Sequence, residues 1–172
     1  AEWLDLVALG TVADVVPLDH TNRILVHQGL LRIRSGRSRP GLQALLALAD
    51  KDPKKLVATD LGFIVGPRLN AAGRLDDMSI GIACLLENDP STATEYALQL
   101  DQLNFERRKI EAGMQEEGVA ILNHLEIDQK TLPWGLCLFD SNWHQGVIGL
   151  LASRIKDRVH RPVIIFADAA YS

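Results

Sequence analysis

Residues Gly135–Phe166 have the sequence GLCLFDSNWHQGVIGLLASRIKDRVHRPVIIF, in which two short apolar runs flank an amphipathic stretch. The runs at Gly135–Phe139 and Pro162–Phe166 have the length of strands, and Gly146–Val159 has the pattern of a helix. Strands joined by a helical crossover are parallel, and parallel sheets are covered by helices. We therefore predict an α/β fold with a βαβ unit here, and we expect further strands beyond Ser172.

A long helical pattern precedes this unit. Asp89 and Pro90 have the residue types of an N-cap and a first helical turn, and helical character extends to about Leu125. At 1.5 Å per residue this helix would be roughly 50 Å long. Its apolar positions follow a seven-residue repeat, but Arg107 and Glu117 lie in the same seam. A helix that bridges two lobes fits this pattern better than a coiled coil, although dimerisation through the helix stays open.

The first half of the chain is predicted to be helical. Apolar side chains recur at helical spacing in four segments, which are residues 2–13, 21–34, 42–49 and 79–87. Thr59 and Asp60 have the residue types that start a helix leading into Leu61–Val65. The chain starts and stops at apolar segments and lacks an initial Met, so we expect it to be a piece of a longer protein.

The composition is that of an ordinary soluble protein. The 172 residues are 47% hydrophobic and 23% charged, and no apolar run approaches the length of a membrane span. Cys84 and Cys137 have no metal-ligand spacing, which is typical of thiols in a reducing, cytoplasmic compartment. The net charge of −4 means that an anionic ligand must be met by a local patch.

The stretch Leu61–Met78, LGFIVGPRLNAAGRLDDM, is a candidate for phosphate binding. Arg68 and Arg74 flank small residues, which allow close backbone approach, and guanidinium groups pair with phosphate oxygens. We predict a loop after Val65 that recognises a phosphoester. The alternative is a tight turn whose arginines pair with Asp76 and Asp77.

Asp14 and an arginine-rich stretch could each contact a ligand, but each could also have a purely structural role. Asp14, at the end of an apolar segment, is a carboxylate that Mg²⁺ or Mn²⁺ could use, but a helix cap or a salt bridge would also explain it. Asp19 and His20 are too few to complete a metal site. The stretch between His20 and Pro40 has no acidic residue and contains five arginines, which form either a solvated face or a phosphate contact (Arg23, Arg32, Arg34, Arg37 and Arg39).

The segment Ser141–Gln145, SNWHQ, precedes the predicted helix of the βαβ unit. A helix N-terminus suits phosphate, His144 could donate to a phosphate oxygen, and Trp143 could stack on a base. In the alternative reading, Ser141 or Asn142 caps the helix and Trp143 fills the core.

Three segments together closely resemble the bacterial RecJ family of the DHH phosphoesterase superfamily. They are DLVALGTVADVVPL, LGFIVGPRLNAAGRLDDMS and SNWHQGVIGLLASRIKDRVHRPVIIFA, with LNFERRKIEAGM between the second and third. The order matches the family, and the resemblance covers essentially the whole chain. It implies the C-terminal part of a DHH catalytic domain over residues 1–88, a connecting helix over 89–126, and the first part of a DHH-associated substrate-binding domain over 127–172.

The resemblance also implies an activity and site residues. RecJ-type enzymes degrade single-stranded DNA from its 5′ end with Mn²⁺ or Mg²⁺, in recombination and repair. Asp14 matches the last metal-binding aspartate, and Arg74 matches an arginine that contacts substrate phosphate. Arg68, Asn70 and His144 lie in the same motifs and are further candidates for DNA contact, whereas no catalytic residue is assigned.

The family motifs that supply the other metal ligands and grip DNA would lie outside these residues. We therefore expect the fragment alone to be inactive, and we expect a cytoplasmic monomer that binds single-stranded DNA, works with repair and replication proteins and does not bind membranes. The alternatives are another DHH-superfamily phosphodiesterase, of the oligoribonuclease or cyclic-dinucleotide type, and a non-catalytic replication scaffold.

Overall fold

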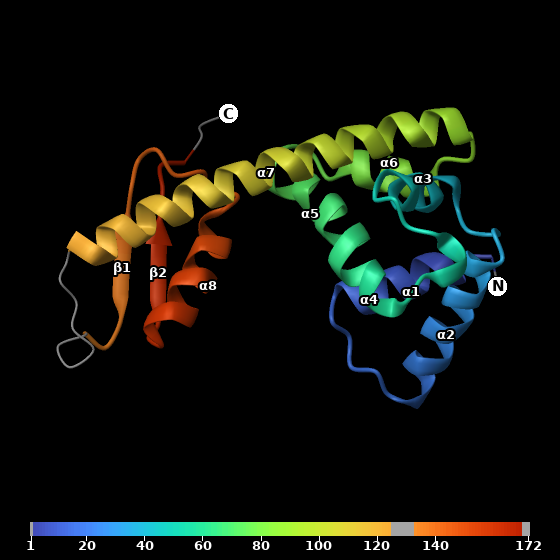
Figure 1. Cartoon of the computed structure of the whole chain (residues 1–172), viewed down its shortest axis with the longest axis horizontal. Coiled ribbons are helices and arrows are strands. Elements are labelled where there is room, and N and C mark those ends of the chain that lie inside the picture. Colours follow the sequence, from blue (N-terminus) through green and yellow to red (C-terminus); the bar gives the residue numbers. More distant parts are fainter. Residues whose placement is uncertain (1, 125–132, 170–172) are drawn as a thin grey trace. The chain divides into compact units, whose positions relative to one another are not determined.

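The computed structural model describes residues 2–124 and 133–169. The described residues form mostly helices with one small parallel sheet, which confirms the predicted α/β class (Figure 1). The elements in chain order are α1 (Leu4–Ala13), α2 (His20–Arg34), α3 (Pro40–Leu48), the 3₁₀ helix η1 (Pro53–Lys55), α4 (Ala58–Asp60), the π-helix η2 (Leu61–Val65), α5 (Gly66–Leu75), α6 (Ser79–Leu86), α7 (Pro90–His124), β1 (Leu136–Phe139), α8 (Ile148–Val159) and β2 (Val163–Phe166).

The chain divides into two compact units, and the division falls inside α7. The first unit is Ala1–Asn104 and the second is Phe105–Ser172. The predicted domain boundary after residue 88 stays a prediction. The predicted boundary after residue 126, like the predicted helix end at Leu125, lies outside the described residues.

The core of the first unit is built from leucine, valine and alanine side chains on the buried faces of successive helices. Its largest fully buried members come from α2, α3, η2 and α7, together with the segment before α4; they are Ile33, Leu42, Leu45, Leu46, Leu56, Leu61, Val65 and Leu100. The helical periodicity predicted for residues 2–13, 21–34, 42–49 and 79–87 is therefore confirmed, with ends that differ by a few residues.

Two glycines let these helices approach each other closely. A Cβ atom on Gly29 would lie 2.4 Å from the Cβ of Ala8, so α2 can pack against α1 only with a glycine there. A Cβ atom on Gly41 would lie 1.9 Å from the carbonyl oxygen of Cys84, so α3 can pack against α6 only with a glycine at this position. Burial at this crossing raises the pKa of the Cys84 thiol to about 11.

A buried carboxylate connects several of these helices. Asp5 of α1 has no exposed surface, and its Oδ2 accepts a hydrogen bond of 2.7 Å from the backbone N–H of Arg39. The Arg32 Nε on α2 lies 3.8 Å from Oδ1 of the same carboxylate. The guanidinium of Arg39 in turn donates to the carbonyl oxygens of Leu85 and Leu86 at the end of α6. One carboxylate and two arginines thus join α1, α2, α3 and α6.

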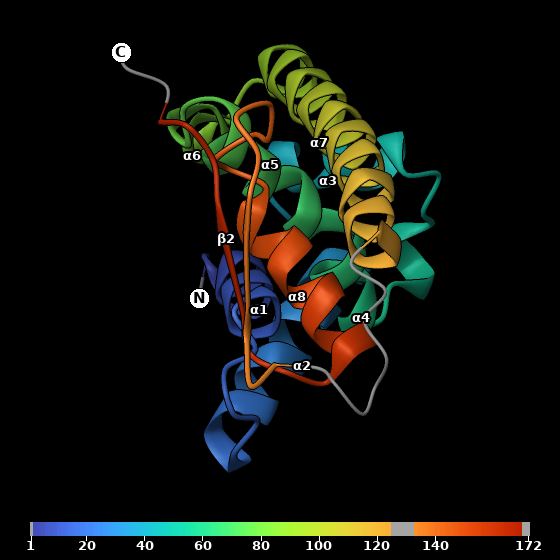
Figure 2. The same ribbon diagram turned by 90° about the vertical axis from the view of Figure 1, so that its left-hand side faces the viewer.

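The second unit contains the predicted βαβ motif. Strands β1 and β2 are parallel, with Leu136 opposite Val163 and Phe139 opposite Phe166, and they lie side by side in both views (Figures 1 and 2). One face of the sheet is buried (Leu136, Leu138 and Ile165), while the other exposes apolar side chains (Cys137, Phe139, Ile164 and Phe166). Strands with two apolar faces are typical of a parallel sheet that is covered on both sides.

Helix α7 packs against α8 in this unit. A Cβ atom on Gly118 would lie 3.1 Å from Cδ1 of Ile155, which shows how close the two helices are. Glu111 of α7 accepts from Arg107 at 2.7 Å and from Arg154 of α8 at 3.4 Å. Arg107, one of the charged seam residues, is thus accommodated by pairing with a carboxylate. None of the helices in the described residues combines the length and apolar character that a bilayer crossing requires.

We predict that Asp89→Ala destabilises the fold at neutral pH, because Asp89 caps α7. Its carboxylate accepts from the Thr92 backbone N–H at 2.8 Å and from the Thr92 hydroxyl at 2.8 Å. These hydrogen bonds hold the pKa of Asp89 below its ordinary value, and the bond from the Thr92 backbone N–H has the largest effect. The capping contribution is therefore present above the ordinary aspartate pKa and lost as pH falls through the lowered one. Denaturant unfolding of both proteins at several pH values tests this, and an unchanged difference at acidic pH would contradict it.

Candidate metal and phosphate site

Asp14 lies at the C-terminal end of α1, where it occupies the C-cap position. Its side chain is exposed, and within the described residues no hydrogen bond or ion pair engages the carboxylate. The alternative explanation as a salt bridge is therefore wrong, and the cap contact is made by the backbone alone. The N–H of Asp14 donates to the Gly10 carbonyl at 3.0 Å. A carboxylate that is held on a rigid helix end and has no protein partner is suited to a hard cation.

The backbone next to Asp14 is strained. Val15 has a φ of 55°, and its N–H donates to the Val12 carbonyl at 3.2 Å, while the Val16 N–H donates to the Thr11 carbonyl at 3.0 Å. This is a Schellman helix ending, in which glycine usually takes the left-handed position. A β-branched residue there costs roughly 1–2 kcal/mol. Such strain is concentrated at functional sites, so its position beside Asp14 supports a functional role for this helix end.

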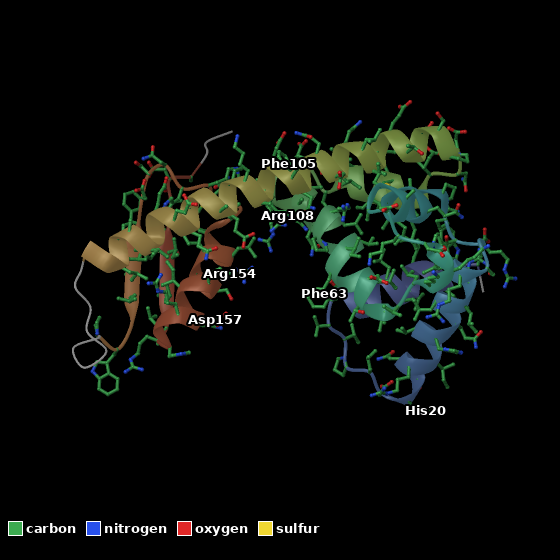
Figure 3. All side chains as sticks on the ribbon, in the orientation of Figure 1. His20, Phe63, Phe105, Arg108, Arg154 and Asp157 are labelled. Carbon is green, nitrogen blue, oxygen red and sulfur yellow. The ribbon has the colours of Figure 1, made fainter. Side chains whose placement is uncertain are left out.

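An apolar groove of about 400 Å³ flanks this helix end. It lies between the end of α1 and the segment from α4 to η2, and Figure 3 labels one of its lining residues, Phe63, whose side chain is 77% exposed. Its lining includes neither Asp14 nor Arg74, and it is formed by Thr11, Val12, Ala13, Val15, Val16, Leu18, Ala58, Thr59, Gly62 and Phe63.

The segment that follows the groove is helical, so the predicted loop is wrong. Residues Leu61–Val65 form a π-helix and Gly66–Leu75 an α-helix. Pro67 stands in the first turn of α5, where its ring favours helical geometry, and the alanines after it are strong helix formers. A π-helix is rare and is often found at functional sites.

The N-terminal end of α5 lies against α1. A Cβ atom on Gly66 would lie 3.4 Å from the Cβ of Ala13, the residue before Asp14. Arg74 lies in the last turn of α5 and is partly buried, while Asn70 is exposed one turn earlier. The helical rise separates Gly66 from Arg74 by roughly 12 Å along the axis. Helix α5 thus links the end of α1 to Arg74, and a cleft shared by Asp14 and Arg74 stays a prediction.

Arg68 has a structural role that its sequence context did not reveal. Its Nε donates to Asp101 of α7 at 2.7 Å, and another guanidinium nitrogen donates to the Ile64 carbonyl at 2.8 Å. The predicted alternative of pairing with Asp76 or Asp77 is wrong for this arginine. Because its donors already bind Asp101 and a carbonyl of η2, Arg68 has fewer donors available for phosphate contact than its sequence position suggested.

The basic stretch from residue 23 to residue 39 is mostly used inside the fold. Arg34 donates to the Leu56 carbonyl at 2.8 Å, and Arg39 is only 8% exposed, with its guanidinium 4.8 Å from the Trp3 ring centroid. These two arginines therefore belong neither to a solvated face nor to a phosphate contact, which were the two interpretations of this stretch.

In the second unit, the segment before α8 is only partly as predicted. Trp143 is 3% exposed and its indole N–H donates to Glu117 at 2.9 Å, so it fills the core and is not available for stacking. No side chain caps α8, and Asp140 instead accepts from the Asn142 backbone N–H at 2.8 Å. His144 is partly buried, and its Nδ1 accepts from the Gly146 N–H at 3.1 Å. This bond places the ring proton on Nε2, which leaves that nitrogen as a donor.

The chain matches proteins of one kind over nearly its whole length. It is 62% identical over 169 residues to the single-stranded-DNA-specific exonuclease RecJ of Dickeya dadantii and 60% identical to that of Escherichia coli, covering 98% of this chain and 29% of each relative. The chain is similar to one part of the RecJ exonucleases. It spans about 29% of the length of these relatives. No family model matches the sequence.

Solved structures agree with this assignment. The segment superposes on RecJ of Thermus thermophilus in complex with Mg²⁺ with a TM-score of 0.82 at 34% identity, covering 96% of this chain and 25% of that one. It superposes on an exonuclease RecJ bound to manganese with a TM-score of 0.83 at 34% identity, covering 96% of this chain and 40% of that one. Within residues 2–124 and 133–169 of the RecJ-like segment, no group of three or more His, Cys, Asp or Glu side chains could hold a metal ion.

We predict that Arg68→Ala lowers the free energy of unfolding by about 1–2 kcal/mol, because the ion pair with Asp101 is partly buried. Asp101→Asn should cost a similar amount, and the double variant should cost less than the sum of the two. A double-mutant cycle by denaturant unfolding measures this coupling. Additive effects on stability, or weakened DNA binding with unchanged stability, would show instead that Arg68 acts on the substrate.

Proposed function

We propose that this segment is part of a metal-dependent exonuclease that degrades single-stranded DNA from its 5′ end, in DNA recombination and repair. The observation that carries this proposal is the match of 98% of the chain, at about 60% identity, to relatives named as single-stranded-DNA-specific exonucleases. The likeness to RecJ structures that contain Mg²⁺ or Mn²⁺ supports a divalent metal. We propose a monomer that acts in the cytoplasm alongside repair and replication proteins.

In this proposal Asp14 supplies one carboxylate to the metal centre. Its exposed, unpaired side chain at the end of α1 fits that role, and the remaining ligands would come from sequence outside this segment. A bound divalent cation would lower the pKa of a water molecule and offset the charge that builds up at the attacked phosphate. The helix end restricts the backbone that carries this carboxylate, since both α1 and its Schellman ending are hydrogen-bonded there.

Arg74 orients the DNA backbone in the same proposal, by pairing its planar guanidinium with phosphate oxygens. Asn70 is exposed on the same helix and is a second candidate for this contact. In the second unit, Nε2 of His144 is a candidate donor to phosphate, since Nδ1 accepts from the Gly146 N–H. The division of the chain into a DHH part up to residue 88, a connecting helix and a DHH-associated part is also part of this proposal.

We predict that Asp14→Ala, made in a full-length protein that contains this segment, lowers Mn²⁺-dependent cleavage at least about a hundredfold because a metal ligand is lost. Arg74→Ala should mainly weaken binding of single-stranded DNA and reduce the salt slope of binding by about 0.7. Glu95→Ala removes another exposed carboxylate and serves as the control. Cleavage assays with single-stranded DNA, duplex DNA, RNA oligomers and cyclic dinucleotides separate the candidate activities. Full activity of the Asp14 variant, or preference for RNA or a cyclic dinucleotide, would contradict the proposal.

We also predict that the 172-residue chain alone does not degrade DNA, because a dinuclear centre needs more ligands than Asp14. The purified chain would be incubated with a labelled single-stranded oligonucleotide and Mn²⁺, with the full-length protein as the positive control. Progressive shortening of the oligonucleotide by the chain alone would overturn this prediction.

A further inference from the structure

Trp134 stands out on the surface of the second unit. It directly precedes β1, and its side chain is 95% exposed, more than any other large hydrophobic side chain in the described residues. An indole offers a large, rigid apolar face, and tryptophan usually buries much of that face in a core or against a partner. The second tryptophan of this unit, Trp143, is buried in the usual way. The indole of Trp134 is therefore accessible to a ligand that uses an aromatic face.

The sheet brings Trp134 next to the turn that follows α8. The Leu136 N–H donates to the Pro162 carbonyl at 2.9 Å, and Leu136 lies opposite Val163. A Cβ atom on Gly135 would lie 3.4 Å from that same Pro162 carbonyl oxygen. Because adjacent strands are about 4.8 Å apart, the segments that lead into β1 and β2 run side by side. Trp134 on one segment thus neighbours Arg161 on the other.

The described residues around the turn after α8 are mostly basic, although the chain as a whole has a net charge of −4. The last two turns of α8 and the turn after them contain four cationic side chains and one acidic one, Asp157, which pairs with Lys156 at 3.2 Å (Figure 3 labels Arg154 and Asp157). Arg158 and Arg161 are both exposed. Within the part of the chain that the structure describes, neither is paired with a carboxylate, and Arg161 donates only to the His160 carbonyl, at 3.0 Å.

The backbone of the turn also departs from the usual pattern. His160 ends α8 with φ 52° and ψ 40°, and its N–H donates to the Lys156 carbonyl at 2.8 Å. Glycine is the common residue at this left-handed position, and an imidazole there is exposed directly before Arg161. The turn thus presents a polar ring and a guanidinium together.

We propose that Trp134, Arg158 and Arg161 form a contact site for single-stranded DNA on the second unit, in which the indole stacks on a base and the guanidinium groups pair with phosphates. An aromatic face combined with unpaired cations is the arrangement by which proteins bind single strands without reading sequence. The local positive charge complements the phosphate backbone. This inference rests on the proposed function and adds a binding surface that the three RecJ-like motifs did not indicate.

The test measures binding of a fluorescein-labelled dT oligomer to the full-length protein by fluorescence anisotropy, in EDTA so that cleavage does not interfere. Trp134→Ala should weaken binding about tenfold, whereas Trp134→Phe should stay within about twofold because a phenyl ring still stacks. Trp134→Leu keeps an apolar side chain without an aromatic face, and it should behave like alanine. Leucine binding as well as phenylalanine would overturn the stacking arrangement.

The charge contribution is tested with a double variant. Arg158→Gln with Arg161→Gln should weaken binding and make the salt slope less steep by about 1.4, which is 0.7 for each of two phosphate contacts. Lys54→Gln with Lys55→Gln removes the same charge from two exposed lysines of η1 and is the matched control. An equal loss in the control would show that only net charge matters, and would overturn the site.

The outcomes also separate this inference from the proposed function. A wild-type protein that neither binds the oligomer nor shortens it with Mn²⁺ contradicts the proposed function itself. A wild-type protein that binds and cleaves, while Trp134→Ala binds equally well, contradicts only the contact site. Thermal unfolding of each variant checks that the fold is retained, as expected for exposed side chains.

Discussion

The carboxylate of Asp5 is the interaction on which the first unit depends. Burying a charge without partners would cost several kcal/mol, so the fold must supply partners. The backbone N–H groups of Leu6 and Arg39 donate hydrogen bonds to the carboxylate, and the Arg32 guanidinium forms a longer ion pair with it. The guanidinium of Arg39 then binds the carbonyls that end α6. These contacts are satisfied together only when α1, α2, α3 and α6 are in place. The network therefore specifies one arrangement of helices, which apolar packing alone would specify less strictly.

The buried contacts of Asp5 also restrict the position of the candidate site, which lies at the other end of α1. Asp5 and Asp14 lie at opposite ends of α1, roughly 13 Å apart along its axis, so anchoring the first turn also orients the last. At that last turn the chain adopts a Schellman ending with a valine in the left-handed position, and the packing of α1 against η2 and α5 holds it there. The first turn of α5 has a second anchor. Arg68 ties this helix to Asp101 of α7 and to a carbonyl of η2, which limits where Arg74 can lie. The two arginines of this motif therefore differ: Arg68 positions the helix, and Arg74 lies partly exposed in its last turn.

The sequence predicted the elements with strong periodicity, and it failed where long-range contacts decide. The βαβ unit and α7 follow from apolar patterns and from the capping pair Asp89–Pro90. The stretch after Val65 was predicted to be a loop because its glycines and small residues are typical of turns. In the fold these small residues belong to a packed helix, since Ala71 and Ala72 of α5 are fully buried and Gly66 begins that helix beside Ala13. The burial of Arg39 and the pairing of Arg68 depend on residues 34 and 33 positions away in sequence, Asp5 and Asp101, which no local pattern reveals.

The same limit applies to the candidate site. Asp14 and Arg74 were found through long motifs, whereas the exposure of Trp134 could not be inferred from local sequence, which also gives no sign that Trp143 is buried. Local sequence shows that an aromatic residue is present, and only the fold determines whether its face meets the core or the solvent. For Trp143, α7 supplies Glu117 as a partner for the indole N–H. Trp134 stands at the entrance to β1, where the neighbouring segment offers a basic turn instead of an apolar surface. Exposing a large aromatic ring beside cations does not stabilise the fold. A ligand that supplies both a base and a phosphate would explain this arrangement.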